Sequence, residues 1–328
     1  MKKTISAAVA LSVFAAPAIA ANLENPLYMP KQGTGYSKTS AGVMYKITDD
    51  SDAHVKKNHD GATEFPIWRV HEELGYGILD NLEAYAKFGY THDGDIDRKG
   101  MHLGRAGLKY RAINTDDGWV WDLYADAQLG GISEMSGSYA ANGFTYDNYS
   151  NGRWGLHVGT QVGKTWSKFS TAAFVEVLRT FGNDNNSIDV SAIAPLFSGL
   201  LPNEISVDLK STTEVNAGLK MFYQMDDRWS FGGGLTYKHH ADNGVEGLAT
   251  EVNPMLLSVP KFQGFLASVK DMNDGFDEYV LNLTAAYQMT DAMQVAVYGE
   301  YTFDTAHAQS QNGTDVKAEL GVRLNVQF

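Results

Sequence analysis

Basic residues recur along one stretch of this chain, and acidic residues recur along the next. Arg105, Lys109 and Arg111 stand two or four positions apart, and Asp122 and Asp126 follow after a segment rich in Asp, Asn and Gly. Residues separated by an even number of positions point to the same face of a β-strand. In two adjacent antiparallel strands these groups would share one surface. They would either pair as ions or set up a transverse field that orients polar solutes, and the sequence leaves both open.

Two other clusters carry residue types that are able to catalyse hydrolysis. Asp95 and Asp97 lie in one polar segment, and His239, His240 and Asp242 lie in another. Histidines and carboxylates serve as general acids and bases, but only when they converge on one reacting group. Both clusters are equally typical of solvated loops.

Metal binding and cofactor binding are not predicted. The alternate acids at 93, 95 and 97 match the start of a calcium loop, but Arg98 stands where glycine is needed and no closing glutamate follows. The pair His239 and His240 has no partner at zinc-ligand spacing. We therefore expect no metal and no cofactor.

The segments that must position these residues show apolar and polar residues in alternation, with a period of two. Apolar residues occupy every second position in segments such as 215–223 and 279–287, and polar residues stand between them. Short turns, as at Asp80 and Asn81, join the segments in pairs, whereas long polar stretches separate the pairs. This pattern predicts an all-β fold of about twelve strands in an antiparallel up-and-down β-barrel, with short turns at one end and long loops at the other.

The last stretch of the chain, 316–328, alternates without a break. Val322, Leu324, Val326 and Phe328 fall on its apolar face, and it exceeds the roughly 9–11 residues of a membrane-spanning strand. It resembles the closing strand of bacterial outer-membrane β-barrels of the porin-like superfamily, whose terminal Phe and alternating apolar positions form the signal read by the barrel-assembly machinery. The resemblance implies a transmembrane barrel in the outer membrane of a Gram-negative bacterium, with periplasmic turns and extracellular loops. Its implied partners are outer-membrane lipid, lipopolysaccharide and that machinery.

The beginning of the chain predicts export. Lys2 and Lys3 precede the apolar run 5–16, and Ala20 ends a small-residue cleavage box. We expect residues 1–20 to be a signal peptide, 21–36 an irregular periplasmic lead-in, and 37–328 the barrel. Loss of the two lysines changes the formal net charge from −13 to −15, and an acidic chain is a poor candidate for nucleic-acid binding. The absence of cysteine excludes a disulfide framework.

The polar face of the strands must carry the function, and neither sign of charge dominates it. A twelve-stranded barrel is intermediate between eight strands, which side chains fill, and sixteen to eighteen, which leave a channel. We predict a porin-like channel for passive diffusion of small hydrophilic solutes. The sequence does not indicate its oligomeric state. Its predicted channel-lining residues are Arg69, Lys87, Arg105, Lys109, Arg111, Asp122, Asp126, Arg153, Glu176, Glu214, Lys220, Glu300 and Arg323.

An enzyme is not expected. Some outer-membrane proteases use an Asp pair with an Asp-His pair at the barrel mouth, and the clusters described above resemble that set only superficially. Outer-membrane phospholipases use Ser, His and Asn on the outer side, but His157 is followed by Gly159 where a serine would be needed.

Two predicted loops, 193–201 and 254–269, are apolar where solvent-facing loops are normally polar. They would constrict the channel, pack as a lid, meet a neighbouring protomer or serve a hydrophobic-solute transporter; a structural or adhesive barrel is a further alternative. Glu72 falls on the apolar side of its strand, so we expect a bulge there or a position near the membrane interface.

Overall fold

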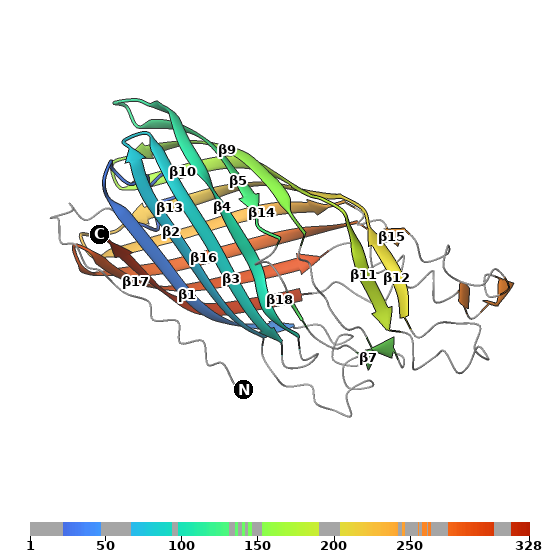
Figure 1. The fold of residues 1–328 in the computed structure, drawn as a ribbon. Coiled ribbons are helices and arrows are strands. Elements are labelled where there is room, and N and C mark those ends of the chain that lie inside the picture. Colours follow the sequence, from blue (N-terminus) through green and yellow to red (C-terminus); the bar gives the residue numbers. More distant parts are fainter. Residues whose placement is uncertain are drawn as a thin grey trace, which may run out of the picture.

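The computed structural model describes residues 22–46, 67–93, 98–130, 135–136, 140–141, 144–145, 153–189, 204–241, 245–246, 255, 258–260, 262–263, 275–304 and 316–328. Twelve long antiparallel strands form one closed ring (Figure 1). In ring order they are β1 (Gly35–Lys46), β2 (Ile67–Leu79), β3 (Leu82–Asp93), β4 (Arg98–Asn114), β5 (Trp119–Gln128), β9 (Gly155–Trp166), β10 (Phe169–Thr180), β13 (Thr212–Gln224), β14 (Trp229–His240), β16 (Phe276–Thr290), β17 (Met293–Asp304) and β18 (Val316–Gln327).

The ring closes where the first strand meets the last. Tyr36 of β1 stands opposite Gln327 of β18, and the antiparallel register runs without a break to Lys46 and Lys317. Closure leaves no exposed sheet edge, which is what a barrel in hydrocarbon requires. The predicted all-β, antiparallel up-and-down barrel of about twelve strands is thereby confirmed.

Short turns connect the strands at one end, here called the turn end. Asp80 and Asn81 alone separate β2 from β3, and Ser167 and Lys168 alone separate β9 from β10. In the turn between β4 and β5, Gly118 adopts a φ of 89°, a left-handed conformation that glycine reaches without steric cost. The opposite end is called the loop end.

The loop end carries a second, smaller sheet that the sequence did not predict. It contains β7 (Ala140–Ala141), β8 (Phe144–Thr145), β11 (Asn183–Asp189), β12 (Glu204–Leu209) and β15 (Val245–Glu246). Figure 1 shows the β11–β12 hairpin standing out beyond the barrel. The segment 182–207 was predicted as loop, and its ends form these two strands instead. A short strand, β6 (Met135–Ser136), pairs with β4 outside the ring.

The outer face of the barrel is apolar. Alternate residues such as Leu219, Leu283 and Leu320 are between 56% and 65% exposed, although they are large and apolar. Exposed aromatic residues gather at both strand ends, among them Trp119, Trp166 and Trp229 at the turn end, and Tyr45, Trp68 and Trp154 at the loop end. An apolar band between two aromatic girdles is the surface of a transmembrane barrel. Among the described residues, no helix is long and apolar enough to cross a membrane.

The bulge suggested by Glu72 is absent. Glu72 stands in regular register opposite Thr39 of β1 and Phe88 of β3, and the β2–β3 register shift falls between Gly77 and Leu79. Its carboxylate instead accepts hydrogen bonds from the hydroxyls of Ser37 (2.6 Å) and Thr39 (2.5 Å). Neighbouring hydroxyls thus satisfy an acid on the outer face.

Candidate functional site in the barrel lumen

The N-terminal segment, Asn22 to Thr34, crosses the lumen at the turn end. The Asn22 amide nitrogen donates hydrogen bonds of 2.8 Å to Gln224 of β13 and to Ser230 of β14. On another side, the amide of Gly33 bonds to the carbonyl of Gly77 in β2. The segment is therefore bound to well-separated strands of the ring. We predicted a periplasmic lead-in here; the structure places residues 22–30 within the barrel wall and leaves residues 31–33 exposed at the turn end.

Further polar contacts fasten this segment to the inner face. Glu24 accepts two hydrogen bonds from Arg323, of 2.9 and 3.0 Å, and one of 2.8 Å from Asn325. The backbone carbonyl of Leu27 accepts a 2.7 Å hydrogen bond from Arg111. The side chain of Leu27 packs with Val120 and Ala172 in a small apolar core at this end of the lumen. Ion pairing and apolar burial together hold the segment in place.

Ion pairs link neighbouring strands on the inner wall. Arg111 of β4 forms a bidentate pair with Asp122 of β5, at 2.8 and 3.0 Å. Lys109 of β4 lies 3.0 Å from Glu83 of β3 and also donates to the Tyr28 carbonyl. The basic and acidic runs seen in the sequence thus lie on adjacent strands and pair there.

A buried network continues this pattern deeper in the lumen. Asp126 contacts the ring of His157 at 2.6 Å and accepts a 2.7 Å hydrogen bond from Tyr85. The other ring nitrogen of His157 lies 3.5 Å from Glu176, which also accepts from Tyr124. These tyrosines and the histidine were not predicted as site residues, although their inward parity on the strands is the signal that would have found them.

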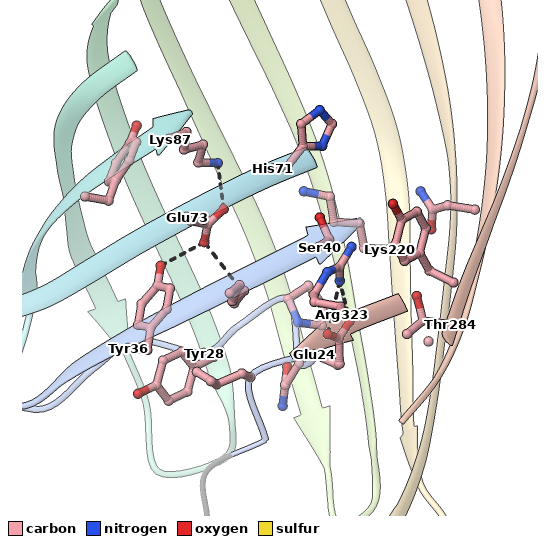
Figure 2. Close-up of a pocket in the computed structure, with 18 of the residues that line it drawn as sticks. Glu24, Tyr28, Tyr36, Ser40, His71, Glu73, Lys87, Lys220, Thr284 and Arg323 are labelled. Carbon is pink, nitrogen blue, oxygen red and sulfur yellow. Dashed lines mark hydrogen bonds and ion pairs between the residues drawn. The ribbon is translucent and has the colours of Figure 1, made fainter. Parts of the chain in front are cut away.

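Glu73 is a meeting point for side chains from several strands. Figure 2 shows it between Tyr36, whose hydroxyl donates a 2.9 Å hydrogen bond, and Lys87, whose ammonium lies 3.3 Å away. Tyr28 of the N-terminal segment packs edge-on against Tyr36, with ring centroids 5.6 Å apart. Burial, together with the nearby negative charge of Glu83, raises the pKa of Tyr28 to about 12. Its phenol therefore stays neutral at physiological pH.

A cavity of about 490 Å³ remains within these groups. Its floor includes Leu23 to Pro26 and Tyr28 of the N-terminal segment. The predicted channel-lining residues that border it are Arg69, Lys87, Arg105, Lys109, Asp126, Glu176, Lys220, Glu300 and Arg323.

Four predicted channel-lining residues do not border the cavity. Arg111 and Asp122 lie beneath the N-terminal segment, in the ion pair described above. Arg153 precedes β9 and donates to the Lys210 carbonyl, and Glu214 pairs with His240 near the loop end. That any of the thirteen residues lines a conducting path stays a prediction.

The histidines that could suggest an enzyme point to opposite faces of β14. His239 is exposed and lies 2.8 Å from Asp277. His240 lies between Glu214 and Glu278, at 3.2 Å from each. Two groups on opposite faces of one strand cannot act on one substrate. Asp95, Asp97 and Asp242 lie outside the described residues.

His157 lies inside the lumen and is buried, so it cannot serve a site on the outer side of the barrel. Within the described part of the chain, no group of three or more His, Cys, Asp or Glu residues is arranged to hold a metal ion. The apolar segment 193–201 lies outside the described residues. So does most of 254–269, of which Phe262 is described and fully buried.

The chain has structural relatives among solved proteins but no match by sequence. No protein-family model and no curated protein sequence matches the chain. An outer membrane channel from Pseudomonas putida F1 has a similar structure, with a TM-score of 0.55 at 14% identity over 94% of this chain and 99% of that chain.

Two other solved structures are less similar. They are the beta domain of the Bordetella autotransporter BrkA (TM-score 0.48, 10% identity, 91% of this chain and 100% of that one) and the NanC porin (TM-score 0.42, 10% identity, 87% and 98%). At such identities only the fold is shared. The channel from Pseudomonas putida F1 therefore has the same fold as this chain, a closed β-barrel.

Proposed function

We propose that this protein is an outer-membrane channel for passive diffusion of small polar solutes, and that the N-terminal segment Asn22 to Thr34 limits its opening. The observation that carries the proposal is the polar cavity inside the closed barrel. The similar fold of a solved outer-membrane channel supports the location and the general role.

The chemistry of the cavity favours polar cargo. Seven basic and seven acidic side chains border it, so a solute passing through always has a charged group within reach. Apolar solutes gain nothing from such a wall, because displacing water from charged groups without replacing their hydrogen bonds is costly. Since neither sign of charge is in excess, we expect weak discrimination between anions and cations. A hydrophobic-solute transporter would need a different lumen from this one.

The N-terminal segment narrows the lumen of the barrel at the turn end. It occupies the turn end of the lumen and forms the floor of the cavity. It is held to the wall mainly by side-chain contacts, with a backbone hydrogen bond at Gly33, and is not a strand of the ring. Such a segment can be displaced without breaking the barrel, whereas the strands cannot.

A reversible covalent lock tests this directly. The Asn25 amide lies 3.2 Å from the Ser170 hydroxyl of β10, and the chain has no cysteine of its own. We therefore pair Asn25→Cys with Ser170→Cys, so that a disulfide can tie the segment to the wall. Purified barrels are inserted in planar bilayers, and conductance is recorded before and after reduction. Reduction should raise the open probability or the conductance.

The matched control ties two strands together and leaves the segment free. The Thr165 and Ser170 hydroxyls lie 2.9 Å apart across the β9–β10 pair, so Thr165→Cys with Ser170→Cys places a disulfide within the wall. Its oxidised and reduced forms should conduct alike. Barrels that stay silent in both redox states of both variants would refute a channel. Equal conductance of the locked and reduced first variant would refute control by the segment.

A further inference from the structure

Two charged side chains of the lumen stand apart from the ion-pair network. The other six cavity-lining Lys and Arg residues lie between 2.9 and 3.9 Å from a carboxylate. Within the described part of the chain, Lys220 of β13 makes no ion pair, and Glu300 of β17 makes neither an ion pair nor a hydrogen bond. Both border the cavity. An unpaired charge in a confined site is expensive unless water or a ligand satisfies it.

These two residues occupy one transverse row of the wall. Lys220 stands opposite Gly234 of β14, Gly234 opposite Asn282 of β16, and Asn282 opposite Glu300. Three inter-strand steps of about 4.8 Å place their Cα atoms about 14 Å apart along the wall. The row thus begins with an ammonium and ends with a carboxylate.

Glycine leaves open space beside this row, at Gly232. A Cβ atom at Gly232, one inward position along β14 from Gly234, would meet no atom closer than 3.6 Å. The Asn282 amide leans over Gly234, with its oxygen 3.2 Å and its nitrogen 3.4 Å from where that Cβ would be. Asn282, Gly232 and Thr284 all border the cavity. The recess therefore has a cationic end, an amide in the middle and an anionic end.

The cationic end is held in position. The Lys220 ammonium lies 4.3 Å from the centroid of the Phe174 ring, which fixes its direction without neutralising its charge. Phe174 is buried in the inner wall. Figure 2 shows Lys220 and Thr284 across the cavity from Glu73 and Lys87, as expected for strands β13 and β2 on opposite sides of the ring. The recess thus lies across the cavity from Glu73 and its partners.

From this row we infer that the recess is a binding subsite for a small zwitterion of dipeptide size. Lys220 receives the carboxylate, Asn282 a hydrogen-bonding group in the middle, and Glu300 the ammonium. A dipeptide is roughly 7 Å long when extended, and a charge-assisted contact of about 2.8 Å at each end brings the span close to the separation of the two strands. The inference rests on the proposed function, because it names the solute class that the channel would favour.

A ligand series on the unmodified barrel tests the subsite without any substitution. Isothermal titration calorimetry of the full-length refolded barrel is carried out with glycylglycine, with N-acetylglycylglycine and with glycylglycine amide. The second compound lacks the ammonium and the third lacks the carboxylate. Glycylglycine should bind about tenfold or more tightly than either, since each loses a charge-assisted contact. Equal binding of all three compounds, or no binding, overturns the inference.

Substitutions of Lys220 and Glu300 then test which end of the subsite binds the carboxylate and which binds the ammonium. Lys220→Met and Glu300→Gln should each weaken glycylglycine binding about tenfold or more, and Lys220→Glu should abolish it. The double variant Lys220→Glu with Glu300→Lys should recover binding, because the zwitterion can enter reversed. The matched control is Lys38→Met, which removes a cavity lysine that faces Glu73, 3.4 Å away, and should leave affinity unchanged. Loss of binding in the double variant, with the barrel folded, would count against the assignment.

Because calorimetry measures binding and planar bilayers measure conductance, the subsite and the channel function are tested independently. Binding without conductance in planar bilayers would leave the subsite standing and remove the proposed function. Conductance without binding would leave the channel function standing and remove the subsite.

Discussion

The amide of Gly35 donates a 2.7 Å hydrogen bond to the carbonyl of Phe328, and the amide of Phe328 donates one of 3.0 Å back to the carbonyl of Gly35. This pair is the last rung of the β1–β18 seam, at the turn end. A Cβ at Gly35 would lie 2.5 Å from the Phe328 ring, so the ring covers the glycine. The residue predicted to carry the assembly signal is therefore also the one that completes ring closure.

Deleting Phe328 should reduce the yield of folded barrel. The deletion removes both hydrogen bonds of the rung and the ring over Gly35, and leaves the start of β1 unpaired. Heat-modifiable mobility of outer-membrane fractions measures the folded yield, and precursor processing measures export. Export should be normal while insertion falls. Phe328→Tyr keeps the ring and the backbone and should insert normally; full insertion of the deletion would contradict the prediction.

Arginine at Leu283 and at Asn282 should have opposite outcomes, because these neighbours on β16 face opposite sides. Leu283 is 61% exposed on the outer surface, whereas Asn282 borders the cavity. Leu283→Arg should lower the free energy of unfolding in lipid vesicles by about 2–4 kcal/mol, and Asn282→Arg should be tolerated. Denaturant titration followed by tryptophan fluorescence measures both. Equal costs would mean that Leu283 does not face hydrocarbon.

Removing Arg111 should be costly, since Asp122 is fully buried beside it. Arg111→Met leaves that carboxylate without its bidentate partner and should destabilise the barrel by about 3–5 kcal/mol. Adding Asp122→Leu should restore most of the loss. The control is Lys164→Met, whose partner Asp117 is 64% exposed, and which should cost less than about 1 kcal/mol. Denaturant midpoints of all four proteins settle the comparison, and no recovery in the double variant would argue against a buried pair.

Asp226 should contribute a stability that depends on pH. The amides of Trp229 and Arg228 donate hydrogen bonds of 2.7 and 2.8 Å to its carboxylate in the β13–β14 turn and lower its pKa below the ordinary 3.8. With the folded pKa below the unfolded one, the contribution is fully present above about pH 3.8 and is lost as pH falls through the folded value. Unfolding midpoints of wild type and Asp226→Asn should therefore differ at pH 6 and converge in acid. Equal midpoints of the two proteins at pH 6 would contradict the prediction.

The sequence predicted the parts of this fold that depend on local periodicity. Alternation of period two identified the strands, the outer face and the inward parity of Lys220 and Glu300. It could not predict which inward charges pair. Arg69, for example, binds Glu319 at 3.1 Å, although its register partners are Gly42 and Thr91. Such contacts depend on strand tilt and side-chain reach, which are properties of the closed ring.

The position of the N-terminal segment in the lumen could not be predicted from the sequence, for a physical reason. The wall residues that bind Asn25 and Glu24 lie between 145 and 301 positions away along the chain. A short irregular run with Pro26 and Pro30 carries no periodic signal of where it will lie. The β11 strand was missed because its polar composition reads as loop. The β12 strand does alternate, with Ile205, Val207 and Leu209, but it is only six residues long.

The same long sequence separations impose an order of events during biogenesis. Glu24 can reach its partners Arg323 and Asn325 only after β18 has taken its place beside β1, and Asn22 needs β13, β14 and β17. The segment therefore settles last, although it precedes every strand in the chain. The lumen of a newly closed barrel is therefore wider at the turn end until the segment docks, and docking narrows the passage.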